Sequence, residues 1–177
     1  PSVISAIADA STNEDAAYSY NASSNFGVDG NTLTYSATLS NGSALPSWLS
    51  INSTSGVLSG TPENADVGAI NVTVTATDTN SASISDTYTL TVNNTNDAAI
   101  IAGTTTGAVT EDASTTTATG TLTHTDVDAN NDANVFTAVS TATDSVSGYG
   151  TYTMTAAGVW TYTLDNTNST VTALAAS

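Results

Sequence analysis

Residues 70–77, INVTVTAT, and residues 87–92, TYTLTV, decide the class of fold. In both stretches an apolar or aromatic residue alternates with threonine or asparagine. This period of two places the apolar side chains on one face of an extended strand and the hydroxyl and amide groups on the other. We therefore expect two central strands of a sheet with one buried and one hydrated face.

Shorter alternating stretches, separated by Asn, Asp, Gly and Ser, predict further strands. They cover residues 3–8, 16–21, 33–39, 49–52 and 57–61 in the first half and 120–125, 134–141, 150–155 and 159–164 in the second. Only residues 169–175 favour a helix, and weakly. Many short strands divided by turn residues are typical of an immunoglobulin-like or cadherin-like sandwich, so the sequence predicts an all-β protein built of antiparallel sheets.

The charge balance excludes several functions. The chain has 177 residues, with 16 acidic residues, one histidine, no lysine, no arginine and no cysteine. Without basic residues it cannot build the patch that neutralises nucleic-acid phosphates. Disulfides, cysteine-ligated metals and lysine chemistry are excluded as well. Because no apolar run approaches the length that spans a bilayer, we expect no membrane insertion.

An internal repeat divides the chain. Glu14-Asp15-Ala16 recurs 97 positions later as Glu111-Asp112-Ala113, and Asp29-Gly30-Asn31 is matched in the same register by Asp126-Val127-Asp128. We therefore expect two domains, residues 1–97 and 98–177. In this register the second domain lacks the counterpart of residues 81–97, which includes its C-terminal strand. Either the chain is part of a longer array or a neighbouring identical chain supplies the strand.

Acidic and amide residues gather at the predicted domain ends. They are residues 93–97, NNTND, the pairs Glu14-Asp15 and Glu111-Asp112, and the alternating pair Asp126 and Asp128. Ca²⁺ takes about six to eight oxygen ligands from carboxylates, amides and backbone carbonyls, and these segments offer all three. The alternative is that the acids cap backbone amides in turns. Since no basic residue is present to pair with them, the sequence favours calcium.

Two sets of motifs resemble known families. The first set is NED at 13–15, DGNTLTY at 29–35, LPSWL at 45–49, GTP at 60–62, ATD at 76–78 and NTND at 94–97, and it resembles the dystroglycan-type cadherin-like modules of bacterial surface proteins. The second set is VTED at 109–112, GTL at 120–122, DVD at 126–128, GTY at 150–152, GVWTYTL at 158–164 and VTAL at 171–174, and it resembles the VCBS repeat of giant bacterial adhesins.

These resemblances imply tandem sandwiches whose junctions bind Ca²⁺, within long adhesins of the repeats-in-toxin kind exported by type I secretion. They also imply the calcium ligands. At the central junction these are Glu14 and Asp66 from the first domain, Asn94, Asn96 and Asp97 from the linker, and Asp126 and Asp128 from the second domain. Asp29 and Asp78 are implied for the preceding junction and Glu111 for the following one.

Other residues predict structure rather than chemistry. His124 has no second histidine or cysteine to share a transition metal, and no nucleophile-elbow pattern brackets a serine, so we expect no enzyme. Trp48 and Trp160 lie in alternating apolar contexts and are expected in the cores. If Tyr18, Tyr20, Tyr149 and Tyr152 were exposed together, they would offer a carbohydrate or protein contact face.

The sequence therefore predicts a calcium-rigidified extender segment of a bacterial adhesin or extracellular filament, whose partners are the adjacent domains of the same array. Two alternatives stay open. One is a module that binds a surface polysaccharide or a protein, and the other is a filament subunit that exchanges strands with identical chains.

Overall fold

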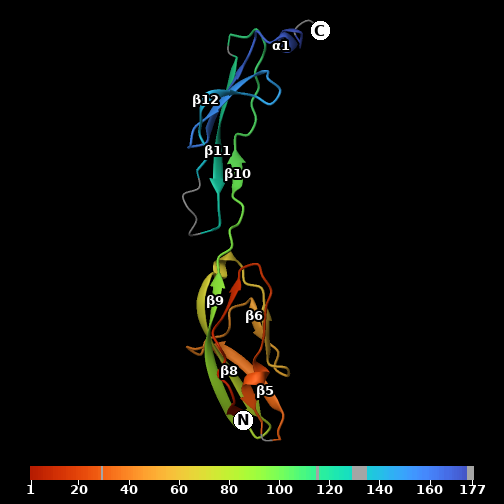
Figure 1. Ribbon diagram of the computed structural model, residues 1–177, viewed down its shortest axis with the longest axis vertical. Helices are drawn as coiled ribbons and strands as arrows, with labels where there is room; N and C mark the ends of the chain where they lie inside the picture. The colour runs from red at the N-terminus through yellow and green to blue at the C-terminus, as the bar shows by residue number, and fades with distance from the viewer. Residues whose placement is uncertain (29, 115, 129–134, 175–177) are drawn as a thin grey trace. The chain divides into compact units, whose positions relative to one another are not determined.

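The computed structural model describes residues 1–28, 30–114, 116–128 and 135–174. The chain divides into two compact units, Pro1–Asn96 and Asp97–Ser177, called here unit 1 and unit 2 (Figure 1). Almost all regular structure in both units is β-strand. Within the described residues, no helix is long and apolar enough to cross a membrane.

Unit 1 is a β-sandwich. Its elements in chain order are β1 (Ser2–Val3), β2 (Ala10–Asn13), β3 (Tyr18–Asn21), η1 (Ala22–Asn25), β4 (Phe26–Gly27), β5 (Leu33–Leu39), β6 (Leu49–Ile51), β7 (Val57–Gly60), η2 (Asn64–Asp66), β8 (Gly68–Asp78) and β9 (Ser83–Asn93). One sheet has the order β2-β9-β8-β5 and the other β3-β7-β6, while β1 and β4 form a small ribbon.

The core of unit 1 lies between these two sheets. Val72, Val74 and Ala76 of β8 and Leu90 of β9 are fully buried, and they belong to the same apolar cluster as Leu58 of β7. On the opposite face of β8 and β9 the side chains are hydroxyls that pair across the strands, as Thr73 does with Thr87 at 2.8 Å between oxygens. Cross-strand hydroxyl pairs of this kind each contribute about 0.2 to 1 kcal/mol.

One strand pairing is parallel, whereas the sequence predicts only antiparallel sheets. β2 runs parallel to β9, with Ala10 opposite Leu90 and Asn13 opposite Asn93. Two aspartates attach the segment before β2 to the same strand: Asp86 Oδ2 accepts the Ile7 N–H at 2.6 Å, and Asp9 Oδ1 accepts the Thr89 N–H at 2.7 Å. The chain entering unit 1 is thus held along β9 by carboxylates as well as by the strand ladder.

Unit 2 forms one sheet from its described strands. The elements are β10 (Ile100–Gly103), β11 (Thr117–Thr125), β12 (Val139–Asp144), β13 (Gly150–Met154), β14 (Val159–Leu164) and the short helix α1 (Ser169–Thr172). The sheet order is β10-β11-β14-β13-β12, and all of its pairings are antiparallel. β11 bridges the sheet, because its first half pairs with β14 and its second half with β10.

A capped turn leads from β14 into α1. The Thr167 hydroxyl and N–H both donate to Asp165 Oδ1, at 2.6 and 2.8 Å, and they lower the pKa of the Asp165 carboxyl below its usual value. Asn168 is the N-cap, since its Oδ1 accepts the N–H groups of Thr170 and Val171. Val171 is the buried residue of this turn.

Most sequence-predicted strands are confirmed, and the two apolar–threonine stretches lie inside the longest ones, β8 and β9. The predicted ranges 33–39 and 159–164 agree with β5 and β14 to the residue. The expected strand at residues 3–8 is wrong beyond Val3, because the amides there are taken by Asn25 and Asp86 rather than by a sheet. The predicted strand at 134–141 starts at Val139, and residue 134 lies outside the described residues.

Candidate functional site

A tight turn places Glu14 at one end of unit 1. The turn begins at Asn13, the last residue of β2, and Asp15 adopts a left-handed conformation with φ 58°. Two backbone bonds fix it: Glu14 N–H donates to Asn93 O at 3.0 Å, and Asp15 N–H donates to Pro62 O at 2.8 Å. The Glu14 side chain is thereby held where β9 leaves the sheet and passes into the linker.

The carboxylate of Glu14 is buried and only half satisfied. The residue is 2% exposed. Its Oε1 accepts the Thr95 N–H at 2.6 Å, whereas the buried Oε2 has no hydrogen-bond partner among the residues that the structure describes. A buried acceptor left unpaired costs about 1 to 3 kcal/mol, and more when it carries charge. The site therefore lacks a positive or hydrogen-donating group, and no lysine or arginine exists in the chain to provide one.

Glu111 repeats this arrangement in unit 2. It is followed by Asp112, whose φ of 54° gives the same left-handed turn. The closing contacts correspond as well, since Ala16 N–H donates to Asn13 O and Ala113 N–H to Thr110 O, both at 3.4 Å.

Glu111 also carries a buried oxygen, Oε1, with no hydrogen-bond partner among the described residues. The two glutamates thus share both a backbone turn and an unsatisfied carboxylate.

Three aspartates meet at the start of unit 2. Asp97 N–H donates to Asp128 Oδ2 at 2.6 Å, and Asp128 N–H donates to Asp126 Oδ1 at 3.0 Å. Asp128 is 7% exposed, while Val127 between the two acids is 57% exposed. Two hydrogen bonds thus connect Asp97, Asp126 and Asp128, which the resemblance assigns to one site.

The remaining residues assigned to the central junction lie in unit 1. Asn94 and Asn96 are exposed and follow β9 directly. Asp66 ends η2, and its Oδ2 accepts the Glu63 N–H at 2.9 Å as part of a capping box. One oxygen of Asp66 is thus already used for local structure, which is the turn-capping role that the sequence left as the alternative to calcium.

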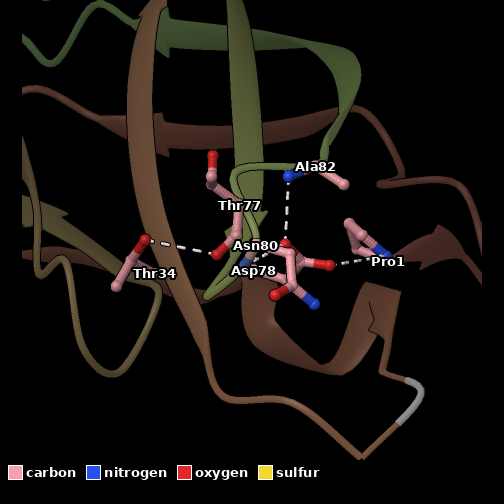
Figure 2. Close-up of polar contacts among 6 residues, drawn as sticks. All are labelled: Pro1, Thr34, Thr77, Asp78, Asn80 and Ala82. Carbon is pink, nitrogen blue, oxygen red and sulfur yellow. Dashed lines mark hydrogen bonds and ion pairs between the residues drawn. The ribbon is translucent and has the colours of Figure 1, made fainter.

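The residues assigned to the preceding junction include Asp78, at the turn between β8 and β9. Figure 2 shows its Oδ1 accepting the N–H groups of Asn80 and Ala82, at 2.8 and 3.0 Å. Its Oδ2 lies 4.0 Å from the Pro1 nitrogen, so the entering chain passes beside this carboxylate. Asp29, the expected companion of Asp78, lies outside the described residues.

The residues present fit a calcium ion in chemistry, although no described group of three or more Asp, Glu, His or Cys side chains forms a complete site. Unit 1 has a buried carboxylate with one oxygen unpaired among the described residues, and in unit 2 the side chains of Asp128 and Asp126 each accept a backbone N–H from another aspartate. All are hard oxygen donors, the kind that Ca²⁺ takes in a flexible geometry. The contact of Thr95 with Glu14 could not be predicted from the sequence, because it is made by a backbone N–H, which almost every residue type carries.

The other singled-out residues occupy mixed environments. His124 stacks edge-on against Phe136, with 5.5 Å between ring centroids, in a packing contact. Trp48 packs half-buried against the core of unit 1. Tyr18 is buried and Tyr20 half-buried, whereas Tyr149 and Tyr152 are 41% and 38% exposed, so the four tyrosines are not exposed together.

The sequence of residues 1–93 matches the He_PIG family, described as "Putative Ig domain". That match covers more than half of the 177 residues. The chain belongs to the He_PIG family. The He_PIG match runs from β1 to the last residue of β9, so it takes in every strand of unit 1 and the Glu14 turn. No curated protein matches the chain.

Solved structures resemble this He_PIG chain only distantly. Protocadherin gamma B2 extracellular cadherin domains 3–6 align with a TM-score of 0.49 and 11% identity, over 89% of this chain and 37% of that one. The human desmocollin-1 ectodomain aligns at 0.42 and 15%, over 91% and 30%. An endo-fucoidan hydrolase of glycoside hydrolase family 107 aligns at 0.40 and 21%, over 90% and 23%. The chain spans about a third of the length of the two cadherin structures, and the fold itself is immunoglobulin-like.

Proposed function

We propose that the chain is a calcium-stiffened extender of a bacterial cell-surface adhesin, in which Ca²⁺ binds between the He_PIG domain and a VCBS-like second domain. The proposal places the protein outside the cell and gives it a mechanical role. It is a spacer whose rigidity depends on the ion, and its partners are the neighbouring domains of the same polypeptide.

The buried carboxylate of Glu14 carries this proposal. It is held by the linker through the Thr95 N–H, yet its Oε2 has no partner in the described part of the chain, which has a net charge of −16 and no lysine or arginine in its full sequence. A divalent cation is the simplest group that satisfies such an oxygen. A ligand contact there is linked directly to the backbone of the linker, so binding would order residues 94–97.

The aspartates of unit 2 supply the second half of the proposed site. Asp97 is the last residue of the linker, and its backbone N–H already donates to Asp128. An ion shared by Glu14 and this cluster would join the two ends of residues 94–97. Because the ion binds the ordered junction and not the relaxed one, it stabilises the ordered state by about 2.7 kcal/mol at a concentration one hundred times its dissociation constant.

The test is a calcium titration of the full chain, followed by thermal unfolding and by small-angle scattering. Calcium is expected to raise the melting temperature and to lengthen the particle, and Mg²⁺ at the same concentration is expected to do neither, because it demands a stricter octahedral geometry. Glu14→Gln and Asp128→Asn should remove most of both responses. Asp144→Asn is the matched control, since Asp144 is exposed on β12 and the charge change is the same.

Three outcomes would overturn the proposal. One is a chain whose shape and melting temperature do not change up to tens of millimolar calcium. Another is an equal loss of response in the Asp144→Asn control, which would show a diffuse charge effect rather than a site. The last is an equal response to Mg²⁺, which would point to general screening of the acidic surface.

A further inference from the structure

The turn that follows β5 contains the one Asn-Gly dipeptide of the sequence, Asn41-Gly42. Residues 40–44 are exposed. Two backbone bonds close the turn: the Gly42 N–H donates to Leu39 O and the Leu39 N–H donates to Ser43 O, both at 2.9 Å. Gly42 has a left-handed conformation, with φ 84°, and nothing lies within 4 Å of the position that a Cβ would occupy. The turn therefore uses a residue without a side chain directly after an asparagine.

The side chain of Asn41 folds back onto the backbone that follows it. Its Oδ1 accepts the Ser43 N–H at 3.0 Å, which makes an Asx-turn. This bond closes a ring of backbone and side-chain atoms that contains both the amide carbon Cγ of Asn41 and the backbone nitrogen of Gly42. A new bond between these two atoms would form a succinimide.

We propose that Asn41 is a site of spontaneous deamidation, which converts its amide to a carboxylate without an enzyme. The Gly42 nitrogen gives its proton to hydroxide and attacks Cγ of Asn41, and negative charge passes to Oδ1. The bond from Cγ to Nδ2 then breaks, and Nδ2 takes a proton from water and leaves as ammonia. Water opens the succinimide at either carbonyl group and leaves aspartate or isoaspartate. The whole change consumes one water molecule and releases one ammonia molecule.

The contacts of the turn favour this route. The Ser43 N–H already donates to Oδ1, the atom on which negative charge develops, as the donor of an oxyanion hole does. Gly42 has no Cβ to obstruct the approach of its nitrogen. One contact opposes the reaction, because the Gly42 N–H must first leave Leu39 O. Since the turn is exposed, this opening is a local fluctuation of the kind that surface loops undergo readily.

Two other exposed asparagines separate the features that matter. Asn52 Oδ1 likewise accepts two backbone N–H groups, at 3.0 and 2.9 Å, but the next residue is Ser53, whose side chain hinders its nitrogen. Asn80 is followed by Ser81, which shares the positive φ, 67°, but also carries a side chain. Among the asparagines that the structure describes, Asn41 alone combines a donor to Oδ1 with a following glycine.

The test incubates the full chain at pH 7, 8 and 9, digests samples with chymotrypsin and follows the change of amide to acid by mass spectrometry. Residues 36–48 lie between the cleavage positions Tyr35 and Trp48, and they contain Asn41 as their only asparagine and no aspartate. Peptides from this range therefore report Asn41 alone. A sample digested before incubation measures any conversion that the digestion itself causes.

Conversion at Asn41 is expected to be at least tenfold faster than at Asn52 or Asn80, and to rise about tenfold for each pH unit because the Gly42 amide must lose its proton. Isoaspartate is expected among the products, since water opens the succinimide at either carbonyl. Conversion at Asn52 or Asn80 that is as fast as at Asn41 would overturn the proposal. Aspartate without isoaspartate would show direct hydrolysis and would overturn the succinimide route.

Variants then test the turn itself. Gly42→Ala should slow conversion at least tenfold, because a Cβ obstructs the attacking nitrogen. Ser43→Ala is the matched control and should keep the rate, since it removes the hydroxyl and retains the N–H. Equal slowing by both variants would overturn the role given to the glycine. A synthetic peptide of residues 36–48 gives the rate without the fold, and protection of the folded chain by more than tenfold relative to it would show that the turn blocks the reaction.

Discussion

Asp15 and Asp112, 97 positions apart in the sequence, occupy the same left-handed backbone conformation, with φ values of 58° and 54°. Each follows a glutamate with a buried carboxylate oxygen that no described residue satisfies. The internal repeat is therefore expressed in backbone geometry as well as in residue type. In both copies the aspartate itself is exposed.

The first prediction concerns this turn. Asp15→Gly should leave unit 1 as stable or slightly more stable, because glycine adopts positive φ without steric cost. Asp15→Val should destabilise it by about 1 to 2 kcal/mol, because a β-branched side chain is strained there. Urea unfolding followed by Trp48 fluorescence measures both. At Asp144, an exposed strand position, valine should be better tolerated than glycine. If valine were worse than glycine at both positions, the positive φ of Asp15 would not be the cause of the difference.

The second prediction concerns the buried hydroxyl pair of Tyr18 and Tyr88, whose oxygens are 3.2 Å apart. Tyr88→Phe leaves the Tyr18 hydroxyl buried without its partner and should cost about 1 to 3 kcal/mol. The double variant with Tyr18→Phe should cost less than the sum of the two single variants, because neither polar group then stays unpaired. Strict additivity in the urea midpoints would show that the hydroxyls do not interact.

The third prediction is a dependence of stability on high pH. Burial raises the pKa of Tyr88, and likewise that of Tyr18, above the ordinary value of 10.0. Above about pH 10 the unfolded chain releases these protons while the folded chain retains them, so stability is constant below that pH and falls above it. Tyrosinate absorbance should show two of the seven tyrosines titrating only on unfolding. Early titration of all seven would contradict the buried pair.

The fold was predictable from the sequence where one face of a strand is buried, and it was less so where backbone groups bond to side chains. Alternation located β5, β8, β9 and β14 because burial acts on every second residue. It failed at residues 3–8, where amides bond to Asp86 and to the Asn25 carbonyl. The parallel pairing of β2 with β9 could not be predicted either, because alternation of apolar and polar residues does not indicate strand direction.

The candidate site was predictable in part. Residue type alone marked Glu14, Asp97, Asp126 and Asp128, and the structure buries or connects each of them. The sequence could not show that Asp66 caps η2 or that Asp78 caps a hairpin turn, because residue type alone does not distinguish an aspartate that caps a turn from one that binds a metal. Burial with an unpaired oxygen distinguishes Glu14, and it depends on the positions of residues far away in the sequence.

The fourth prediction separates general charge repulsion from a specific site. With 16 acidic residues and no base, repulsion should weaken the folded state at low ionic strength. Sodium chloride raised to about 0.15 M, where the Debye length is about 8 Å, should increase the melting temperature, with little further gain at higher salt. Glu14→Gln should keep this sodium response in full. A sodium response that disappears in Glu14→Gln would mean that sodium acts at the Glu14 carboxylate itself, and it would contradict general charge repulsion as the cause.

The last prediction concerns the packing of Trp160 over Gly120. A Cβ atom at Gly120 would lie 2.7 Å from three atoms of the indole ring, so Gly120→Ala must displace Trp160. The displacement breaks the 2.7 Å bond from Trp160 Nε1 to Thr104 O, which joins β14 to the segment after β10. We expect unit 2 to lose about 1 to 3 kcal/mol of stability, with a red shift in Trp160 emission, while the Trp48 signal of unit 1 stays unchanged.

Gly148→Ala is the control for that change. Gly148 has φ 68° and open space around its Cβ position, so alanine there strains the backbone without touching the indole. It should lower stability and leave Trp160 emission unaltered. If Gly120→Ala behaved in the same way, the indole would not be packed on the strand.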